Sequence, residues 1–331
     1  MSEATALAFD PMEIAAAWRR LRHAVRVIKR IRSLRASDTR IATQRSDQWN
    51  DFSRLADGFS DLYNKIALRE NSDLTLPYWS RTNAELERYL LPKPRFDFLN
   101  QPLLIETLMT ERDPAADLRF LEKHLSRERL QEVLREDLVG DPAIHNELYA
   151  TSYLSVFHLR HMVEYELTTG ARLADFQRVI EWGGGQGNFA KLMWRINGPR
   201  TYVVVDTPLF TCLQWLYLST TLGAHSVVVH SSEPVRIRPG LINLVPLSLI
   251  RSATLEPPDL FVSTWALSES SRAAQDFAVA RGWMAADHLL LAYQTEARRF
   301  PLAERVGGLA KSNGAEIIGV AGWPKNFYAF K

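Results

Sequence analysis

The sequence has 331 residues, of which 46% are hydrophobic, and this supplies enough apolar material for one large or two ordinary globular domains. The 40 Lys and Arg residues nearly balance the 38 Asp and Glu residues, which excludes the whole molecule as an electrostatic binder of nucleic acid or of an acidic membrane. One cysteine, Cys212, excludes an intramolecular disulfide, and neither a signal peptide nor an apolar span of roughly 20 residues is present, so we expect a cytoplasmic protein.

The N-terminal part of the chain has a helical pattern. From residue 11 to about residue 168, apolar residues recur at spacings of three and four, and strand-like runs are almost absent. Prolines at 77, 92, 94, 102 and 114 separate the predicted helices. We therefore expect residues 1–140 to form an α-helical N-terminal domain that caps the remainder, residues 141–331.

A basic helix is predicted near the N-terminus. Eight Arg or Lys residues lie between Arg19 and Arg35, opposite an apolar stripe. Such a helix can contact RNA, an anionic membrane or an acidic carrier protein, or it can form a homodimer interface. The alternative is an amphipathic helix that packs on the body of the protein with a solvated basic face. The near-neutral total charge favours a small-molecule enzyme without nucleic acid or membrane partners.

Beyond Asp175, short β-rich runs alternate with helical segments, which is typical of a parallel α/β sheet. Thr207, Pro208 and Gly223 predict the two ends of one helix, with Thr207 as its N-cap. A terminal antiparallel pair is expected at 315–320 and 327–331. The other predicted strands are 178–181, 201–205, 227–230, 260–264 and 288–293, and the predicted helices are 189–196, 208–222, 268–281 and 300–312.

The heptapeptide EWGGGQG, residues 181–187, lies between a predicted buried strand and a predicted helix. Such a turn presents free backbone N–H groups at a helix N-terminus, and glycine lets a ligand approach closely. A dinucleotide fingerprint, G-x-G-x-x-G, does not fit, because Asn188 or Ala190 occupies its last position. The spacing is instead E-x-G-x-G-x-G. Asp206 ends the next strand, 25 residues after Glu181, where a carboxylate can accept the ribose hydroxyls of a nucleoside.

These motifs resemble those of class I S-adenosylmethionine-dependent methyltransferases. The segments EWGGGQGNFAKL, VVVDTPLFTCLQWLYLSTTLG and DLFVSTWALSES are similar to the sugar O-methyltransferase family, although Trp182 and Ser263 depart from its pattern. The resemblance implies a Rossmann-like, seven-stranded, mostly parallel sheet with a terminal antiparallel strand. It also implies S-adenosylmethionine as cofactor, bound by Glu181, Trp182, Gly183, Gly185, Gln186, Gly187, Asp206, Thr207, Thr264 and Trp265.

The implied reaction is methyl transfer to a hydroxyl of a small sugar-like or natural-product substrate. A hydroxyl is a poor nucleophile and needs a general base, for which His158 and Glu269 are the candidates. The alternatives are that His158 is a partly buried interface histidine and that Glu269 stabilises a helix start. We assign Tyr153, His161 and Tyr293 to substrate binding. No metal is expected, since no carboxylate follows the fourth strand to hold Mg²⁺.

The same residues are also compatible with a second reaction. Aromatic faces stabilise cations, and Trp182 and Trp265 adjoin the predicted ligand-binding turns. In this alternative the enzyme is a cyclase that consumes the cofactor itself. The amino group of the methionine part attacks its own γ-carbon, which releases methylthioadenosine and forms azetidine-2-carboxylate. Holding the chain bent supplies most of the catalysis, and no acceptor is needed.

Overall fold

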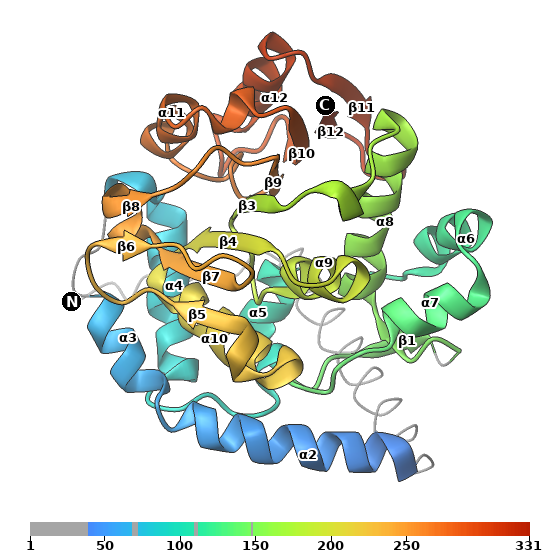
Figure 1. Cartoon of the computed structure of the whole chain (residues 1–331), viewed down its shortest axis with the longest axis vertical. Coiled ribbons are helices and arrows are strands. Elements are labelled where there is room, and N and C mark those ends of the chain that lie inside the picture. The colour runs from blue at the N-terminus through green and yellow to red at the C-terminus, as the bar shows by residue number, and fades with distance from the viewer. Residues whose placement is uncertain (1–38, 68–71, 109–111, 147) are drawn as a thin grey trace, which may run out of the picture.

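Alternating apolar residues in the C-terminal half form one mostly parallel sheet (Figure 1). The computed structural model describes residues 39–67, 72–108, 112–146 and 148–331. Within these residues the largest sheet has eight strands in the order β11-β12-β10-β9-β3-β4-β7-β5. In chain order they are β3 (Arg178–Trp182), β4 (Thr201–Asp206), β5 (Val227–Val229), β7 (Ile242–Pro246), β9 (Leu260–Thr264), β10 (His288–Gln294), β11 (Glu316–Gly319) and β12 (Asn326–Phe330).

The strand order confirms the predicted fold class. The run β7-β4-β3-β9-β10 is parallel and has the doubly wound order of a Rossmann sheet. Strand β12 is antiparallel to both of its neighbours, β10 and β11. The protein therefore has a Rossmann-like sheet that ends in an antiparallel strand.

One strand of the eight-stranded sheet is missing from the sequence prediction. The predicted strand at 227–230 exists as β5, but it lies at the edge of the sheet, and β7 lies between it and β4. The prediction of seven strands was therefore one strand short. The residues of β7, INLVP, are a short apolar run that ends in proline, and Pro246 is tolerated there because it closes the strand.

The side chains of β3 alternate between two apolar layers, as a strand buried on both faces requires. Val179 belongs to the layer covered by α8, α9 and α10, whereas Ile180 and Trp182 belong to the layer covered by α11 and α12 (Figure 1). The predicted helix at 268–281 starts later than expected because the Ser271 hydroxyl accepts a bond from the Ala274 N–H and caps it. These helices are α8 (Tyr153–Thr169), α9 (Asn188–Asn197), α10 (Pro208–Leu222), α11 (Arg272–Ala280) and α12 (Ala303–Ser312).

The N-terminal helices share the core of the sheet layer. Phe52, Phe59 and Leu86 are buried in the same apolar cluster as Phe189 and Leu213 of α9 and α10. The division of the chain at residue 140 stays a prediction, and the basic helix at 19–35 lies outside the described residues. These helices are α2 (Thr39–Ala56), α3 (Phe59–Ala67), α4 (Pro77–Leu90), α5 (Pro102–Thr107), α6 (Ala115–His124) and α7 (Arg127–Leu134). Across the described ranges, every helix is too short or too polar to traverse a lipid bilayer.

Candidate functional site

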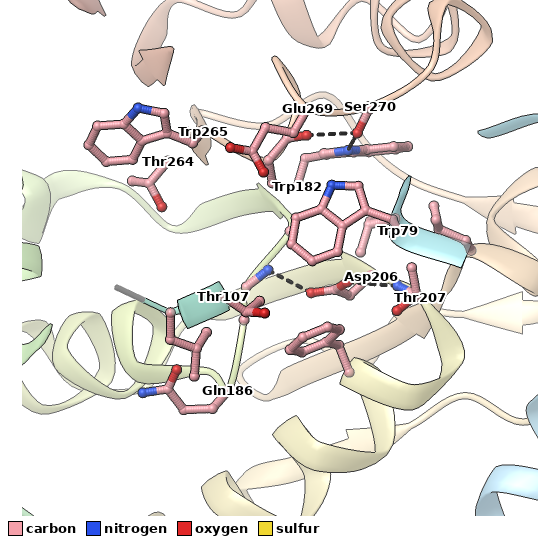
Figure 2. Close-up of a pocket in the computed structure, with 18 of the residues that line it drawn as sticks. Trp79, Thr107, Trp182, Gln186, Asp206, Thr207, Thr264, Trp265, Glu269 and Ser270 are labelled. Carbon is pink, nitrogen blue, oxygen red and sulfur yellow. Dashed lines mark hydrogen bonds between the residues drawn. The ribbon is translucent and has the colours of Figure 1, made fainter. Parts of the chain in front are cut away.

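A cavity lies at the carboxyl ends of β3, β4 and β9, where the strand order reverses (Figure 2). Open α/β sheets bind ligands at this position, because the loops from two neighbouring strands diverge there. Its walls come from the glycine turn after β3, the residues after β4 and β9, helix α8, and two segments of the N-terminal helical region. The predicted nucleotide turn is therefore part of a cavity.

Close packing explains the glycines at the start of the turn. Gly183 has a φ of +77°, and a Cβ there would lie 2.0 Å from the Cβ of Ala266. A Cβ on Gly184 would lie 2.6 Å from Cγ1 of Val204. A side chain at either position would displace its neighbours, so close packing requires glycine at both.

The structure brings most of the predicted turn residues to the cavity. Gly183, Gly185 and Gln186 line it, and the Gln186 side chain is almost fully buried. Gly187 does not line it. It occupies the N-cap of α9 in a left-handed conformation, and its N–H donates to the Gly184 carbonyl at 2.8 Å. Gly187 therefore shapes the turn and does not contact the cavity.

Asp206, the last residue of β4, connects the two sides of the site (Figure 2). Its Oδ2 accepts from the Gly184 N–H at 2.9 Å and from Gln214 Nε2 at 2.7 Å, and its Oδ1 accepts from the Thr207 N–H at 2.7 Å. Burial raises the pKa of Asp206 to about 7, against the effect of these donors. A carboxylate has about four acceptor positions, so Oδ1 retains capacity for one ligand hydroxyl.

Glu181 lies beneath the turn and does not line the cavity. It is 1% exposed, and its Oε2 accepts from the Tyr202 hydroxyl at 2.9 Å. Burial raises the pKa of Glu181 to about 8, so the carboxyl is protonated at neutral pH. Glu181 is therefore bonded to Tyr202 in the core and is not part of the cavity lining, so its role in cofactor binding stays a prediction.

Thr207 does not cap α10 with its side chain, contrary to the sequence prediction. The residue is at the N-cap position, but its N–H donates to Asp206 and its buried Oγ1 has no protein partner. Thr207 lines the cavity beside Asp206 (Figure 2). Because buried hydroxyls are almost always hydrogen-bonded, this oxygen is available to a polar atom in the cavity, from a ligand or from water.

The ring of Trp182 packs in the apolar layer that α11 and α12 cover. Its Nε1 donates to Ser270 Oγ at 2.9 Å, and its ring lies 6.1 Å from that of Trp283 and 6.4 Å from that of Phe277. Trp182 also contributes to the cavity wall. The indole therefore links the cavity to the packing of α11.

Trp265 follows β9 and, with Thr264, lines the cavity. Its backbone has a φ of +67°, which is rare for a bulky residue. The indole Nε1 donates to Asn326 Oδ1 at 2.7 Å, and the ring stacks on Phe157 of α8 at 5.5 Å. These contacts hold Trp265 in place beside the cavity.

The N-terminal region supplies cavity residues that sequence reasoning missed. Leu76 and Trp79, at the start of α4, and Thr107 and Leu108, at the end of α5, line the cavity. Figure 2 shows Trp79 and Thr107 beside Asp206 and the glycine turn. The rings of Trp79 and Phe210, a residue of α10, are nearly perpendicular, with 6.3 Å between their centroids. The only signal in the sequence was the pair of aromatics after Pro77, and nothing there indicated which helix meets the sheet.

Both predicted catalytic residues reach the cavity. Glu269 accepts from Gln294 Nε2 at 2.9 Å, and its carboxyl group lies across the cavity from Asp206 in Figure 2. Burial raises the pKa of Glu269 to about 8. His158 of α8 also lines the cavity, with Nδ1 3.1 Å from Asn188 Nδ2. Burial and the nearby Lys191 charge lower the pKa of His158 to about 3, which disfavours it as a base.

The three residues predicted to bind substrate lie outside the cavity lining. Tyr153 is buried and stacks on Phe157 at 5.3 Å. His161 is fully buried, with Nδ1 2.7 Å from the Tyr328 hydroxyl. Tyr293 is buried against α12. In each case the side chain points into an apolar layer, so it packs the core and does not contact the cavity.

No cluster of three or more His, Cys, Asp or Glu side chains suited to a metal ion occurs among the residues that the structure describes.

No protein-family model and no curated protein matches the sequence. Among solved structures, the chain is similar to a mutant of MtNAS in complex with S-adenosylmethionine, at 16% identity over 85% of this chain and 96% of that chain, with a TM-score of 0.39. It is similar to an O-methyltransferase family protein from Burkholderia thailandensis, at 12% identity over 89% and 97%, TM-score 0.34. It is also similar to the mitomycin 7-O-methyltransferase MmcR, at 14% identity over 74% of this chain and 75% of that chain, with a TM-score of 0.33.

The chain has the class I methyltransferase fold. Its parallel strand order, with β12 antiparallel between β10 and β11, is the arrangement that defines this fold.

Proposed function

We propose that the cavity binds S-adenosylmethionine and that the protein is an enzyme that uses it to methylate a small acceptor. The observation that carries this proposal is the geometry of Asp206, which is fixed to the glycine turn by Gly184 and keeps one acceptor position free beside the orphaned hydroxyl of Thr207. Gly185, Gln186, Asp206 and Thr207 would hold the nucleoside. Trp265 and Trp79 would adjoin the sulfonium, which aromatic faces stabilise.

Glu269 is the residue that would accept the proton of the acceptor. Its carboxyl group lies in the cavity across from Asp206, and Gln294 fixes it by one hydrogen bond. S-adenosylmethionine supplies the methyl group, and this chain's residues orient the acceptor and exclude water. The acceptor that we propose is a hydroxyl of a small sugar-like or natural-product molecule.

The cyclase is a second candidate, and the chemistry of Glu269 favours it. A carboxyl with a pKa of about 8 is better matched to the proton of an ammonium than to that of an alcohol. In this reaction Glu269 takes a proton from the α-ammonium, the nitrogen forms a bond to the γ-carbon, and the bond from that carbon to sulfur breaks. Sulfur keeps the electron pair, so the products are methylthioadenosine and azetidine-2-carboxylate.

Mass spectrometry of the purified protein with S-adenosylmethionine alone separates the two reactions. Formation of methylthioadenosine together with an azetidine acid would support the cyclase reaction and contradict the methyltransferase reaction. If the cofactor is stable alone and S-adenosylhomocysteine forms only when hydroxylated small molecules are added, the methyltransferase stands. Calorimetry that detects no binding of S-adenosylmethionine would reject both.

A further inference from the structure

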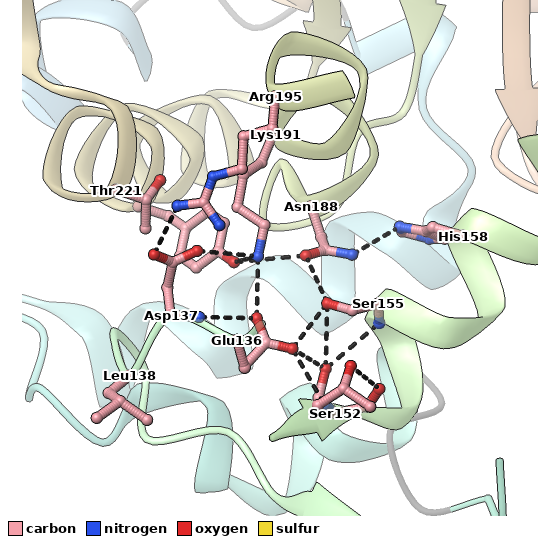
Figure 3. A network of polar contacts seen from close by, with 12 residues as sticks. Glu136, Asp137, Leu138, Ser152, Ser155, His158, Asn188, Lys191, Arg195 and Thr221 are labelled. Atoms are coloured by element: carbon pink, nitrogen blue, oxygen red, sulfur yellow. Dashed lines mark hydrogen bonds and ion pairs between the residues drawn. The ribbon is translucent and has the colours of Figure 1, made fainter. Parts of the chain in front are cut away.

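Behind the cavity, a buried polar network connects His158 to a buried lysine (Figure 3). His158 Nδ1 lies 3.1 Å from Asn188 Nδ2, and Asn188 Oδ1 lies 3.4 Å from the Tyr217 hydroxyl. Lys191, which is 1% exposed, donates to Tyr217 at 2.7 Å and to Glu136 Oε1 at 2.9 Å. The line of contacts runs from the cavity into the core.

The lysine sets the direction of every hydrogen bond in this line. An ammonium group only donates, so the Tyr217 oxygen must accept from Lys191, and its own hydrogen points to Asn188. The oxygen of the Asn188 amide therefore faces Tyr217, and its NH₂ group faces His158. Because that NH₂ group donates, Nδ1 of His158 must accept.

The consequence is a single tautomer of the imidazole. With Nδ1 as acceptor, the hydrogen of the neutral ring is on Nε2. That nitrogen is not among the buried orphaned atoms and has no hydrogen bond in the described residues, while the ring lines the cavity. A nitrogen that already carries a hydrogen cannot remove a proton from an acceptor, so this arrangement argues against His158 as general base.

We propose that His158 donates a hydrogen bond from Nε2 to a ligand carboxylate, and that Asn188 is a positioning residue that fixes this tautomer. The ligand assignment rests on the proposed function. S-adenosylmethionine carries a carboxylate, yet no Lys or Arg occurs among the residues that line the cavity as described. His158 is adjacent to the first residue of α9, directly after the glycine turn. It is therefore placed to bind the amino-acid part of the cofactor.

NMR of the ¹⁵N-labelled protein without ligand tests the tautomer. The His158 signals, assigned with a His158→Gln variant, should show a protonated Nε2 and an unprotonated Nδ1. Asn188→Asp replaces the donor by an acceptor of the same shape, so the hydrogen should move to Nδ1 or the ring should become charged near neutral pH. A protonated Nδ1 in the parent protein would overturn the proposal, whether or not the variant folds.

Calorimetry tests the carboxylate, with S-adenosylmethionine and methylthioadenosine as the two probes. His158→Phe should weaken S-adenosylmethionine binding roughly tenfold and leave methylthioadenosine, which has no carboxylate, unchanged. His158→Gln, which keeps an N–H donor, should recover most of the loss. Equal losses for both probes, or none, would overturn the assignment. If the parent protein binds neither probe, both the carboxylate assignment and the proposed function are wrong. The NMR experiment still tests the tautomer independently.

Discussion

Three carboxyl groups at the site differ in role although burial raises the pKa of each. Asp206 contacts the cavity and the turn, Glu269 faces the cavity, and Glu181 is sealed beneath the turn. Their sequence positions predicted Glu181 and Asp206 equally well as ligand-binding acids. Only the tertiary structure separates them, because Glu181 points into the layer that holds Tyr202.

Glu181 predicts a pH dependence of stability. Its folded pKa of about 8 lies above its usual value of 4.5, so its contribution is complete below pH 4.5 and is lost as the pH rises through 8. The free energy of unfolding of the parent, minus that of Glu181→Gln, should fall by roughly 3 kcal/mol between pH 5 and pH 8. Urea titrations across this range measure it, and a constant difference would contradict the assigned burial.

Asp206→Ala should reduce the affinity for S-adenosylmethionine at least tenfold, because it removes the hydroxyl acceptor and releases the Gly184 N–H from the turn. Isothermal titration calorimetry measures the loss. The control is Asp287→Ala, an exposed aspartate outside the cavity lining, which should bind as the parent does. Unchanged binding in Asp206→Ala would refute the placement of the nucleoside.

Glu269→Gln should slow product formation about 100-fold or more and change the cofactor affinity by less than about threefold, since the amide keeps the shape but cannot take a proton. In the parent, the rate should rise with pH up to about 8, because the ionised carboxylate is the active form. The mass-spectrometric assay described above gives the rates. An exposed glutamate on α12, Glu304, provides the control Glu304→Gln. Full activity in Glu269→Gln would exclude this residue as the base.

The residues of the turn and of the strand ends could be predicted because a strand, a glycine turn and a helix fix their relative positions within a few residues. Tyr153, His161 and Tyr293 could not be placed this way. Tyr153 and His161 lie on α8, which is buried on nearly all sides, so its periodicity does not indicate which side chain faces a cavity. Tyr293 lies on β10, a strand buried on both faces.

At the level of elements, the buried side chain of Lys191 anchors helix α9 through ion pairs. The sequence did not indicate that this lysine is buried. Lys191 pairs with Glu136 at 2.9 Å and with Asp137 at 3.2 Å, and Arg195 pairs with Asp137 at 2.8 Å (Figure 3). Burial lowers the pKa of Lys191, but the acids outweigh this effect and raise it. In sequence, Lys191 reads as the polar side of an amphipathic helix, because its partners lie 54 and 55 residues earlier.

Lys191→Met should destabilise the protein by about 3–5 kcal/mol, because it leaves two buried carboxylates without their main cation. Urea denaturation followed by circular dichroism measures the change. Lys123→Met, at an exposed position near the end of α6, should alter stability by less than about 0.5 kcal/mol. If both variants unfold at the same urea concentration as the parent, the network is not a stabilising element.

The order of the strands was also only partly predictable. The alternation of apolar residues and the turn residues predicted most strands. Strand β7 was not predicted, because a short apolar run that ends in proline shows no alternation of apolar and polar residues. Strand β7 pairs with β4, although α10 and β5 lie between them in the chain. Local sequence patterns do not indicate such a pairing.

For the whole molecule, the cavity is the place where the helical region and the sheet meet. Trp79 and Thr107 come from the first 140 residues, and the glycine turn, Asp206 and Glu269 come from the remainder. A site built in this way requires both parts to be docked before it is complete.

Trp79→Ala should therefore weaken S-adenosylmethionine binding by about tenfold while the fold persists, because the wall over the glycine turn is opened to water. Fluorescence or calorimetric titration measures the affinity. Trp49→Ala supplies the matched control, since Trp49 is 47% exposed and does not line the cavity. A loss of equal size in Trp49→Ala would indicate a general effect of destabilising the helical region.

The left-handed backbone of Trp265 bears on how this protein can be engineered. A bulky residue in that conformation costs about 1–3 kcal/mol, and glycine or asparagine would be favoured by the backbone alone. The indole is nevertheless held in place by Asn326 and by Phe157. Redesign guided by backbone preference would select this position first, and it would remove an aromatic wall of the cavity in the same step.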